Sequence, residues 1–237
     1  MSLATDSCDP LVLPTLILRA SERIKARWTL AQSDPIAFLR WFTYSCDQHD
    51  KEQPCRPFPW HLDYIQYLVR LWQHNPKLSV LKSRQMMLTW LFVILATWEA
   101  IFHDGRLIML QSKREADAIG DENSGDGLMG RAKYVLNHMP CREYLIPGYE
   151  PTAKMMRFTD RGSTLQAIPQ GGHVIRTHTV SGVVSDEAAL QEECSDAYTA
   201  AMPCVRGGGW YVSITTPSYA DKGFTRRLHE DNLSETG

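Results

Sequence analysis

The amino-acid sequence predicts an α/β fold with a central, mostly parallel sheet flanked by helices, preceded by an N-terminal helical lead-in. The first observation is a short apolar run at 78–81, followed by a basic and polar turn and a long run with hardly a charge that ends at residue 102. The second is the alternation of strand-like and helix-like segments, which favours parallel strands joined by right-handed crossovers. The third is the pair Asp186-Glu187 directly after an apolar run, as expected where a strand ends at a ligand-binding edge.

The composition is that of an ordinary globular protein. The chain has 237 residues, of which 43% are hydrophobic and 22% charged, enough for one large or two small domains. A net charge of −2 and a pI of about 6.4 give no global sign of a nucleic-acid partner. We divide the chain into an N-terminal helical segment, 1–57, and a core, 58–237.

Membrane and disulfide classes are disfavoured. The N-terminus lacks the regions of a signal peptide, and the most apolar run, 88–102, is too short for a bilayer and carries Glu99. Six cysteines form no C-x-x-C pair, which favours reduced thiols in a cytosolic protein. A zinc site is the less favoured alternative because its ligands would be irregularly spaced. Those ligands would be Cys46, His49, Cys55 and His61.

The N-terminal segment is predicted to be largely helical. Residues 1–15 read as a leader, and Asp34-Pro35 supplies an N-cap followed by proline at the first helical position. The polar residues 46–57 are predicted to form a loop, and Pro59 opens a helix whose apolar residues recur every 3.6 positions. The predicted helices are 16–32, with Arg19, Arg23, Lys25 and Arg27 facing solvent, then 36–44, and one from Pro59 to His74.

The core is predicted to alternate strands and helices. Ser112-x-x-Glu115 has the pattern of a capping box and predicts a helix start, which glycines then interrupt. The turn 159–162 joins two strands as a hairpin. The predicted strands are 78–81, 106–111, 155–158, 163–168, 182–187 and 210–215, and the predicted helices after the first strand begin at 89, 112, 128 and 195.

The turn at 82–89 has the strand–turn–helix layout of a phosphate-binding loop. Its backbone N–H groups and the helix N-terminus offer partial positive charge to an anion. The pattern G-x-x-x-x-G-K-[ST] is mostly absent, because Leu88 stands in place of lysine and Met87 and Lys82 in place of the glycines. A buried strand followed by a core helix without a ligand is therefore the competing interpretation.

The turn and the acid pair form a pattern with two threonines farther along the chain. The hydroxyl of Thr89 can bind Mg²⁺, Asp186 can hold the other side of the ion, and Glu187 can polarise an attacking water. The threonines that end the last strand, Thr215 and Thr216, could sense the γ-phosphate. All of these residues are predicted to lie at the carboxyl edge of the sheet. Solvated acids at a strand end are the alternative for the acid pair.

These segments resemble the three ATPase motifs of the large terminase subunit of tailed bacteriophages, the motor that pumps DNA into procapsids. The matching motifs are Lys82-Ser83-Arg84-Gln85-Met86-Met87-Leu88-Thr89, Val183-Val184-Ser185-Asp186-Glu187 and Ser213-Ile214-Thr215-Thr216-Pro217. Residues 34–39 and 57–59, ahead of Gln66, also look like the N-terminal region of that family. The resemblance implies a P-loop NTPase fold of the ASCE type.

The resemblance also implies a role for each matching residue. Residues 82–89 would bind nucleotide, with Lys82 as the phosphate lysine and Arg84 stabilising γ-phosphate charge. Gln66 would contact adenine. Thr89 and Asp186 would hold Mg²⁺, Glu187 would activate water, and Thr215 and Thr216 would couple hydrolysis to motion. Arg176 stands where some relatives carry an arginine that reaches the neighbouring subunit's nucleotide; a salt-bridging arginine at a strand edge is the alternative.

From this resemblance we expect an ATP hydrolase that uses ATP and Mg²⁺ and translocates double-stranded DNA without sequence preference. The implied partners are further copies in a ring, the phage portal and the small terminase subunit, in the host cytoplasm at the procapsid. The family's nuclease domain has no counterpart in these residues, so we expect no DNA cleavage. A non-hydrolysing interaction module is the alternative that Met87 and Leu88 favour; a helicase-like ATPase is disfavoured because further basic helicase motifs are missing.

Overall fold

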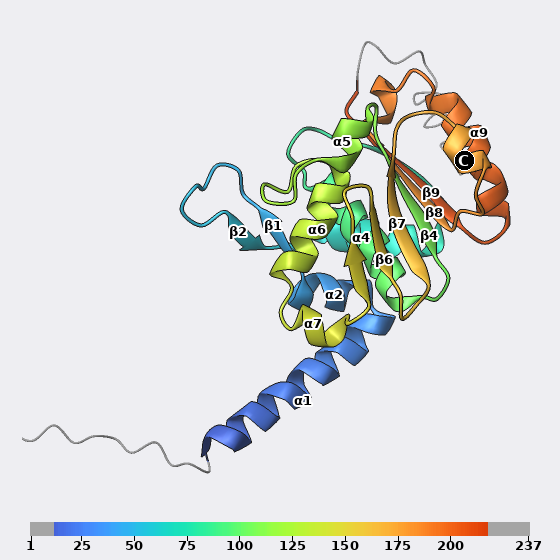
Figure 1. The fold of residues 1–237 in the computed structure, drawn as a ribbon. Coiled ribbons are helices and arrows are strands. Elements are labelled where there is room, and N and C mark those ends of the chain that lie inside the picture. The colour runs from blue at the N-terminus through green and yellow to red at the C-terminus, as the bar shows by residue number, and fades with distance from the viewer. Residues whose placement is uncertain (1–11, 218–237) are drawn as a thin grey trace, which may run out of the picture.

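The computed structural model describes residues 12–217, with side chains from residue 20 onward, and is built around a twisted sheet between two helical layers (Figure 1). Within those residues the main sheet has seven strands in the order β3-β9-β8-β4-β7-β6-β5. The first five are parallel, and β6 and β5 are added antiparallel. The predicted α/β class with a mostly parallel sheet is confirmed.

The strands of this sheet are β3 (Lys77–Leu81), β4 (Leu107–Gln111), β5 (Tyr149–Pro151), β6 (Met155–Phe158), β7 (Ser163–Ile168), β8 (Gly182–Asp186) and β9 (Trp210–Thr215). The helices are α1 (Val12–Ser33), α2 (Pro35–Phe42), α3 (Asp63–His74), α4 (Leu88–Phe102), α5 (Glu115–Ile119), α6 (Leu128–His138), α7 (Arg142–Leu145), α8 (His173–Arg176), α9 (Cys194–Arg206) and the 3₁₀ turn η1 (Ala188–Leu190). A separate hairpin consists of β1 (Tyr44–Cys46) and β2 (Cys55–Pro57).

Helix α4 is the centre of the larger core. All of its residues are buried, because one side lies on the sheet and the other is covered by α2 and α6. This explains a helix without a polar face. The opposite face of the sheet is covered by α8 and α9, where Ala197 and Ala201 pack near Val183 and Tyr211. The chain thus forms three layers, as expected for a sheet buried on both faces.

The N-terminal region differs from prediction in its boundaries. Helix α1 begins at Val12, not residue 16, with Pro14 in its first turn, where proline is tolerated. The predicted leader over residues 1–11 lies outside the described residues. In Figure 1 the helix projects away from the body of the molecule. The Asp34 cap is confirmed, since its Oδ1 accepts a hydrogen bond from the Ile36 N–H at 2.9 Å.

The loop predicted over 46–57 was wrong at both ends, where β1 and β2 pair. Three-residue strands are too short to show a period of two in the sequence. The next helix begins at Asp63 rather than Pro59, because residues 59–62 form a turn in which the Trp60 N–H bonds to the Phe58 carbonyl.

Two local predictions in the core were also wrong. The run 78–81 was expected to form a buried strand, but within residues 12–217 strand β3 pairs only with β9, at the edge of the sheet, and Leu81 is 39% exposed. An apolar run does not reveal how many neighbours a strand has. Ser112 does not cap a helix, because α5 begins at Glu115 and Arg114 occupies the cap position, where its side chain does not cap the helix. Ser112 instead extends the pairing of β4 through its N–H.

The described residues contain no helix that is both long and apolar enough to cross a membrane.

Candidate active site

Three neighbouring parallel strands end at one edge of the sheet and bring the predicted motifs together. The register places Leu81 of β3 opposite Thr215 of β9, and Ile214 opposite Asp186 of β8. The Lys82 N–H continues this pairing by bonding to the Thr215 carbonyl at 2.9 Å. Side chains that follow these strands are therefore held by backbone hydrogen bonds, which makes their spacing a property of the sheet.

Thr89 and Asp186 meet in the centre of this edge. The Thr89 hydroxyl donates to Asp186 Oδ1 at 3.0 Å, and Lys82 Nζ donates to the same hydroxyl at 3.4 Å. Both Thr89 and Asp186 are buried. A hydroxyl and a carboxylate in contact offer the hard oxygen ligands that Mg²⁺ prefers. The donor set therefore fits a magnesium ion.

Burial sets the electrostatics of Asp186. It raises the pKa of this carboxyl, while the positive charges of Lys82 and Arg131 oppose the rise and the neighbouring Glu187 adds to it. A buried carboxylate at the end of a strand is costly unless cations compensate it. The positive charges of Lys82 and Arg131 thus offset part of the desolvation cost of the Asp186 carboxylate.

Glu187 is held beside this pair in a strained backbone conformation. Its φ of 51° lies in the left-handed region, which a non-glycine residue adopts only when the surroundings impose it. Glu187 Oε1 lies 3.8 Å from Lys82 Nζ, and Oε2 accepts a hydrogen bond from the Thr216 hydroxyl at 3.3 Å. The carboxylate is partly exposed, so it can reach a water molecule in the adjoining cavity.

Thr215 connects the end of β9 to the segment after the acids. Its buried Oγ1 accepts a hydrogen bond from the Ala189 N–H at 3.1 Å and donates to the Thr216 carbonyl. Together with the Thr216–Glu187 contact, this ties both threonines to residues 187–189. The structure therefore brings the two threonines and the acid pair into one hydrogen-bonded group.

The loop before α4 keeps the backbone shape of a phosphate-binding turn without its glycines. Gln85 and Met87 have φ values of 63° and 56°, both left-handed. For such residues this costs about 1–2 kcal/mol each. Leu88, which stands in place of the usual lysine, is only 3% exposed and belongs to the core. The side chain at position 88 thus serves packing rather than ligand binding.

Two cavities open beside the loop. One, of about 570 Å³, extends from Asp186 and Glu187 toward α5 and α6; the other, of about 560 Å³, lies between the loop and the β1–β2 hairpin. Lys82, Thr89 and Arg131 line both. The second is also lined by Gln85, Met86, Met87 and Leu88. Their volumes fall in the range of ordinary small-ligand sites.

Besides Thr215 and Thr216, four predicted residues lie outside these cavities. Ser83 and Arg84 are exposed at the tip of the loop. The Gln66 amide points to the His61 carbonyl at 3.5 Å. Arg176 pairs with Asp196 and lines another cavity together with Ser181 and Gly209, at the amino-terminal edge of the sheet. The roles predicted for these four residues stay predictions.

The sequence analysis missed one charged residue of the site. Arg131 on α6 lines both cavities, and its guanidinium lies 5.6 Å from the centre of the Trp90 ring. It stands outside the motifs, in a helix whose pattern is that of an ordinary amphipathic segment. Only the fold reveals that this helix reaches the carboxyl edge.

Cys46, His49, Cys55 and His61 do not come together as the zinc alternative requires. Among the described residues no group of three or more histidine, cysteine or acidic side chains is arranged to hold a metal, and the five cysteines in that part of the chain form no disulfide.

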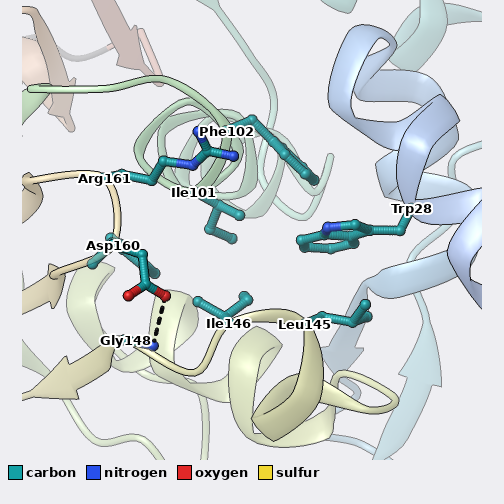
Figure 2. A pocket seen from close by; sticks show the side chains of 9 residues that line it. Trp28, Ile101, Phe102, Leu145, Ile146, Gly148, Asp160 and Arg161 are labelled. Carbon is teal, nitrogen blue, oxygen red and sulfur yellow. Dashed lines mark hydrogen bonds between the residues drawn. The ribbon is translucent and has the colours of Figure 1, made fainter.

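A smaller cavity of about 150 Å³ lies at the other end of α4 (Figure 2). Trp28, Phe102 and Ile146 face into it, and Asp160 on its rim accepts a hydrogen bond from the Gly148 N–H at 3.1 Å. Phe102 is about 20 Å from Thr89 along the helix, at a rise of 1.5 Å per residue. This space is too small and too distant to belong to the site around Asp186.

Comparison with known proteins agrees with the fold. The structure is similar to the HK97 bacteriophage large terminase, with a TM-score of 0.57 and 16% identity over 86% of this chain. It is also similar to the large terminase of the thermophilic bacteriophage D6E, with a TM-score of 0.53 and 16% identity over 73% of this chain. The chain covers only 41% and 43% of those two proteins.

Neither a known protein-family profile nor a curated protein sequence matches the chain. At this level of identity the similarity establishes the architecture rather than the activity. The resemblance noted in the motifs thus extends to three dimensions: this chain has the α/β fold of phage large terminases.

Proposed function

We propose that this chain is the ATPase motor domain of a phage large terminase, which couples ATP hydrolysis to the translocation of double-stranded DNA into a procapsid. The observation that carries the proposal is the contact between Thr89 and Asp186, with Lys82 and Glu187 beside it. Residues from two separate motifs supply a hydroxyl, a carboxylate, a cation and a second carboxylate at one cavity. This is the set of groups that phosphoryl transfer to water requires.

In this proposal each side chain has one task. Thr89 and Asp186 hold Mg²⁺, which when bound neutralises charge on the phosphates. Lys82 binds the phosphate chain at the metal-binding hydroxyl. Glu187 accepts a hydrogen bond from the attacking water and takes its proton. As the water oxygen bonds to the γ-phosphorus, the bond from that phosphorus to the bridging oxygen breaks and ADP leaves. The backbone N–H groups of residues 85–89 line the phosphates at the start of α4.

Coupling and subunit contacts are the further parts of the proposal. Thr216 bonds to Glu187, so loss of the γ-phosphate can be relayed from the acid to β9 through a single hydrogen bond. Arg84 at the loop tip and Arg176 at the opposite edge are exposed; we assign Arg84 to γ-phosphate charge and Arg176 to a neighbouring subunit's nucleotide. Gln66 is assigned to adenine, which requires its side chain to turn away from His61.

The assigned partners follow from the motor role. The motor contacts the phosphate backbone of double-stranded DNA and does not read the base sequence. Copies of the chain act as a ring at the phage portal, with the small terminase subunit, in the host cytoplasm.

The test is steady-state phosphate release with Mg-ATP, with and without double-stranded DNA. Glu187→Gln keeps the size of the side chain and should lower the rate by at least about 10²-fold, the usual contribution of a general base. Glu143→Gln is the matched control, because that side chain is 90% exposed and lies outside both cavities. Equal rates of phosphate release for wild type and Glu187→Gln would contradict the role of Glu187 as general base.

A non-hydrolysing interaction module remains the second candidate, because Met87 and Leu88 depart from the phosphate-loop pattern. Equilibrium binding of a fluorescent ATP analogue separates the two. The motor requires that the analogue binds in the presence of Mg²⁺ and that Lys82→Ala abolishes this binding. The interaction module requires no binding of the analogue.

A further inference from the structure

Arg131 lines both cavities of the candidate site and has no carboxylate partner among residues 12–217. Its side chain is partly buried, its Nε atom is fully buried, and this nitrogen has no hydrogen-bond partner among the described residues. No ion pair within 4.0 Å involves Arg131 in that part of the chain. The guanidinium faces both cavities and the ring of Trp90.

This arrangement is unfavourable unless an anion completes it. Burial lowers the pKa of Arg131, and only the more distant charges of Asp186 and Asp126 oppose that effect. Removing a cation from water costs several kcal/mol when no partner is in contact. Other arginines of the fold, such as Arg106 and Arg161, lie within 3.5 Å and 3.1 Å of carboxylates.

The chain fixes Arg131 relative to the phosphate-binding loop. Gly125, in the connection between α5 and α6, packs so closely on Trp90 that a Cβ would lie 2.7 Å from its ring. Trp90 directly follows Thr89, and its ring also contacts Tyr134 on α6, with centroids 5.7 Å apart. The position of Arg131 is therefore tied to the start of α4 by packed side chains.

Leu88 explains why such a cation is needed. The residue before the metal-binding hydroxyl is a lysine in the usual phosphate loop, and here it is a buried leucine. Lys82 alone lies within hydrogen-bond distance of Thr89 among the cations of the described residues. A second cation aimed at the same point from α6 would restore the charge that binds the phosphate chain.

We propose that Arg131 is a phosphate-binding residue of the nucleotide site and replaces, from α6, the cation that Leu88 cannot supply. The ligand class is a nucleoside triphosphate, so the inference rests on the proposed function. Asp186 attracts Arg131 in the free protein. A magnesium ion held by Thr89 and Asp186 would neutralise that carboxylate, which would leave the guanidinium free to bind the phosphates.

The first experiment measures binding of a fluorescent ATP analogue with Mg²⁺ to wild type, Lys82→Ala, Arg131→Gln and Arg157→Gln. A charge-assisted hydrogen bond is typically worth about 10- to 100-fold in affinity. Arg131→Gln should lose that factor, whereas Arg157→Gln should bind like wild type because Arg157 is exposed on β6. Circular dichroism confirms that each variant is folded.

The second experiment uses the wild-type protein and so does not depend on a variant that folds. Phenylglyoxal modifies arginines, and mass spectrometry reports each site. Saturating Mg-ATP should slow the modification of Arg131 at least about 10-fold, because the guanidinium would then be engaged in a charge-assisted hydrogen bond to phosphate. AMP, which lacks the phosphate chain, should not protect it, and Arg157 should stay reactive throughout.

The outcomes separate this inference from the proposed function. No Mg-ATP binding by wild type would overturn both. Binding that Lys82→Ala abolishes, together with wild-type affinity in Arg131→Gln or unprotected Arg131, would overturn the role of Arg131 alone.

Discussion

The Thr89 hydroxyl donates a hydrogen bond to the Asp186 carboxylate at 3.0 Å, although the two residues are 97 positions apart in the chain. The contact exists because β3 and β8 are both hydrogen-bonded to β9 and end at the same edge. A shift of one residue in the register of β8 would turn Asp186 to the other face of the sheet. The alignment of three strands thus determines whether a metal can be held here.

Thr89→Val tests this contact. The substitution keeps the shape of the side chain and removes the hydroxyl, so the buried Asp186 loses a donor at a cost of ~1–3 kcal/mol in the free energy of unfolding. Mg-dependent nucleotide binding should weaken in parallel. Thr89→Ser keeps the hydroxyl and should bind Mg-ATP like wild type. Urea unfolding and analogue binding measure both effects, and a Val variant with unchanged binding would exclude Thr89 as a ligand.

Leu88→Lys should not repair the loop. Position 88 is 3% exposed and faces the core, so a lysine there buries a cation without a partner. We expect a loss of ~3 kcal/mol or more in unfolding free energy, with no gain in ATP affinity. Gln85→Lys, at an exposed position of the same loop, is the control and should leave the unfolding midpoint nearly unchanged. Tighter binding by the Leu88 variant would show that the lysine reaches the phosphates.

Gly125→Ala and Gly162→Ala separate strain from steric clash. Both glycines have positive φ, +63° and +61°, but a Cβ at Gly125 would meet Trp90 at 2.7 Å, whereas at Gly162 it meets nothing within 4 Å. Gly162→Ala should cost about 1 kcal/mol from backbone strain alone. Gly125→Ala should cost ~1–3 kcal/mol more, because the packed ring must move. Thermal unfolding gives both values; equal losses would contradict the tight contact at Trp90.

Glu99→Gln should change how stability depends on pH. Burial raises the pKa of the Glu99 carboxyl above its ordinary value of 4.5, although the Trp210 indole and the charge of Arg106 oppose the rise. Between 4.5 and that raised pKa the folded protein holds a proton that the unfolded chain has released, so the unfolding free energy falls as pH rises. Glutamine does not titrate, so the variant lacks this decrease in unfolding free energy.

Urea unfolding at pH 4 and pH 7 should therefore show Glu99→Gln gaining stability relative to wild type as pH rises. Glu143→Gln, at a 90% exposed side chain, should show no such trend. A difference between Glu99→Gln and wild type that does not grow from pH 4 to pH 7 would contradict a raised pKa.

Much of the fold could be predicted because its signals are local. The N-cap at Asp34, the hairpin at 159–162 and the apolar run at 88–102 each carry their own cause in neighbouring residues. The strand end at Asp186 was found because apolar residues change abruptly to acids. The candidate site followed from the rule that parallel strands present ligands at their carboxyl ends.

The errors concern information that neighbours do not carry. That β3 lies at an edge depends on which strands pair with it. Ser112 fits a capping box by spacing, yet its backbone is used by the sheet. Arg131 had no motif, because its place in the site comes from the glycine-rich connection that packs α6 on α4.

Trp90 gives the site a mechanical connection to the outer helical layer. The residue directly follows the hydroxyl of Thr89, and its ring touches Gly125 and lies beside Tyr134 and Arg131. Close-packed interiors transmit small displacements instead of absorbing them. A displacement of the start of α4 is therefore transmitted to α6 by the Trp90 ring. This contact lies at the wall of the cavity where the triphosphate would bind.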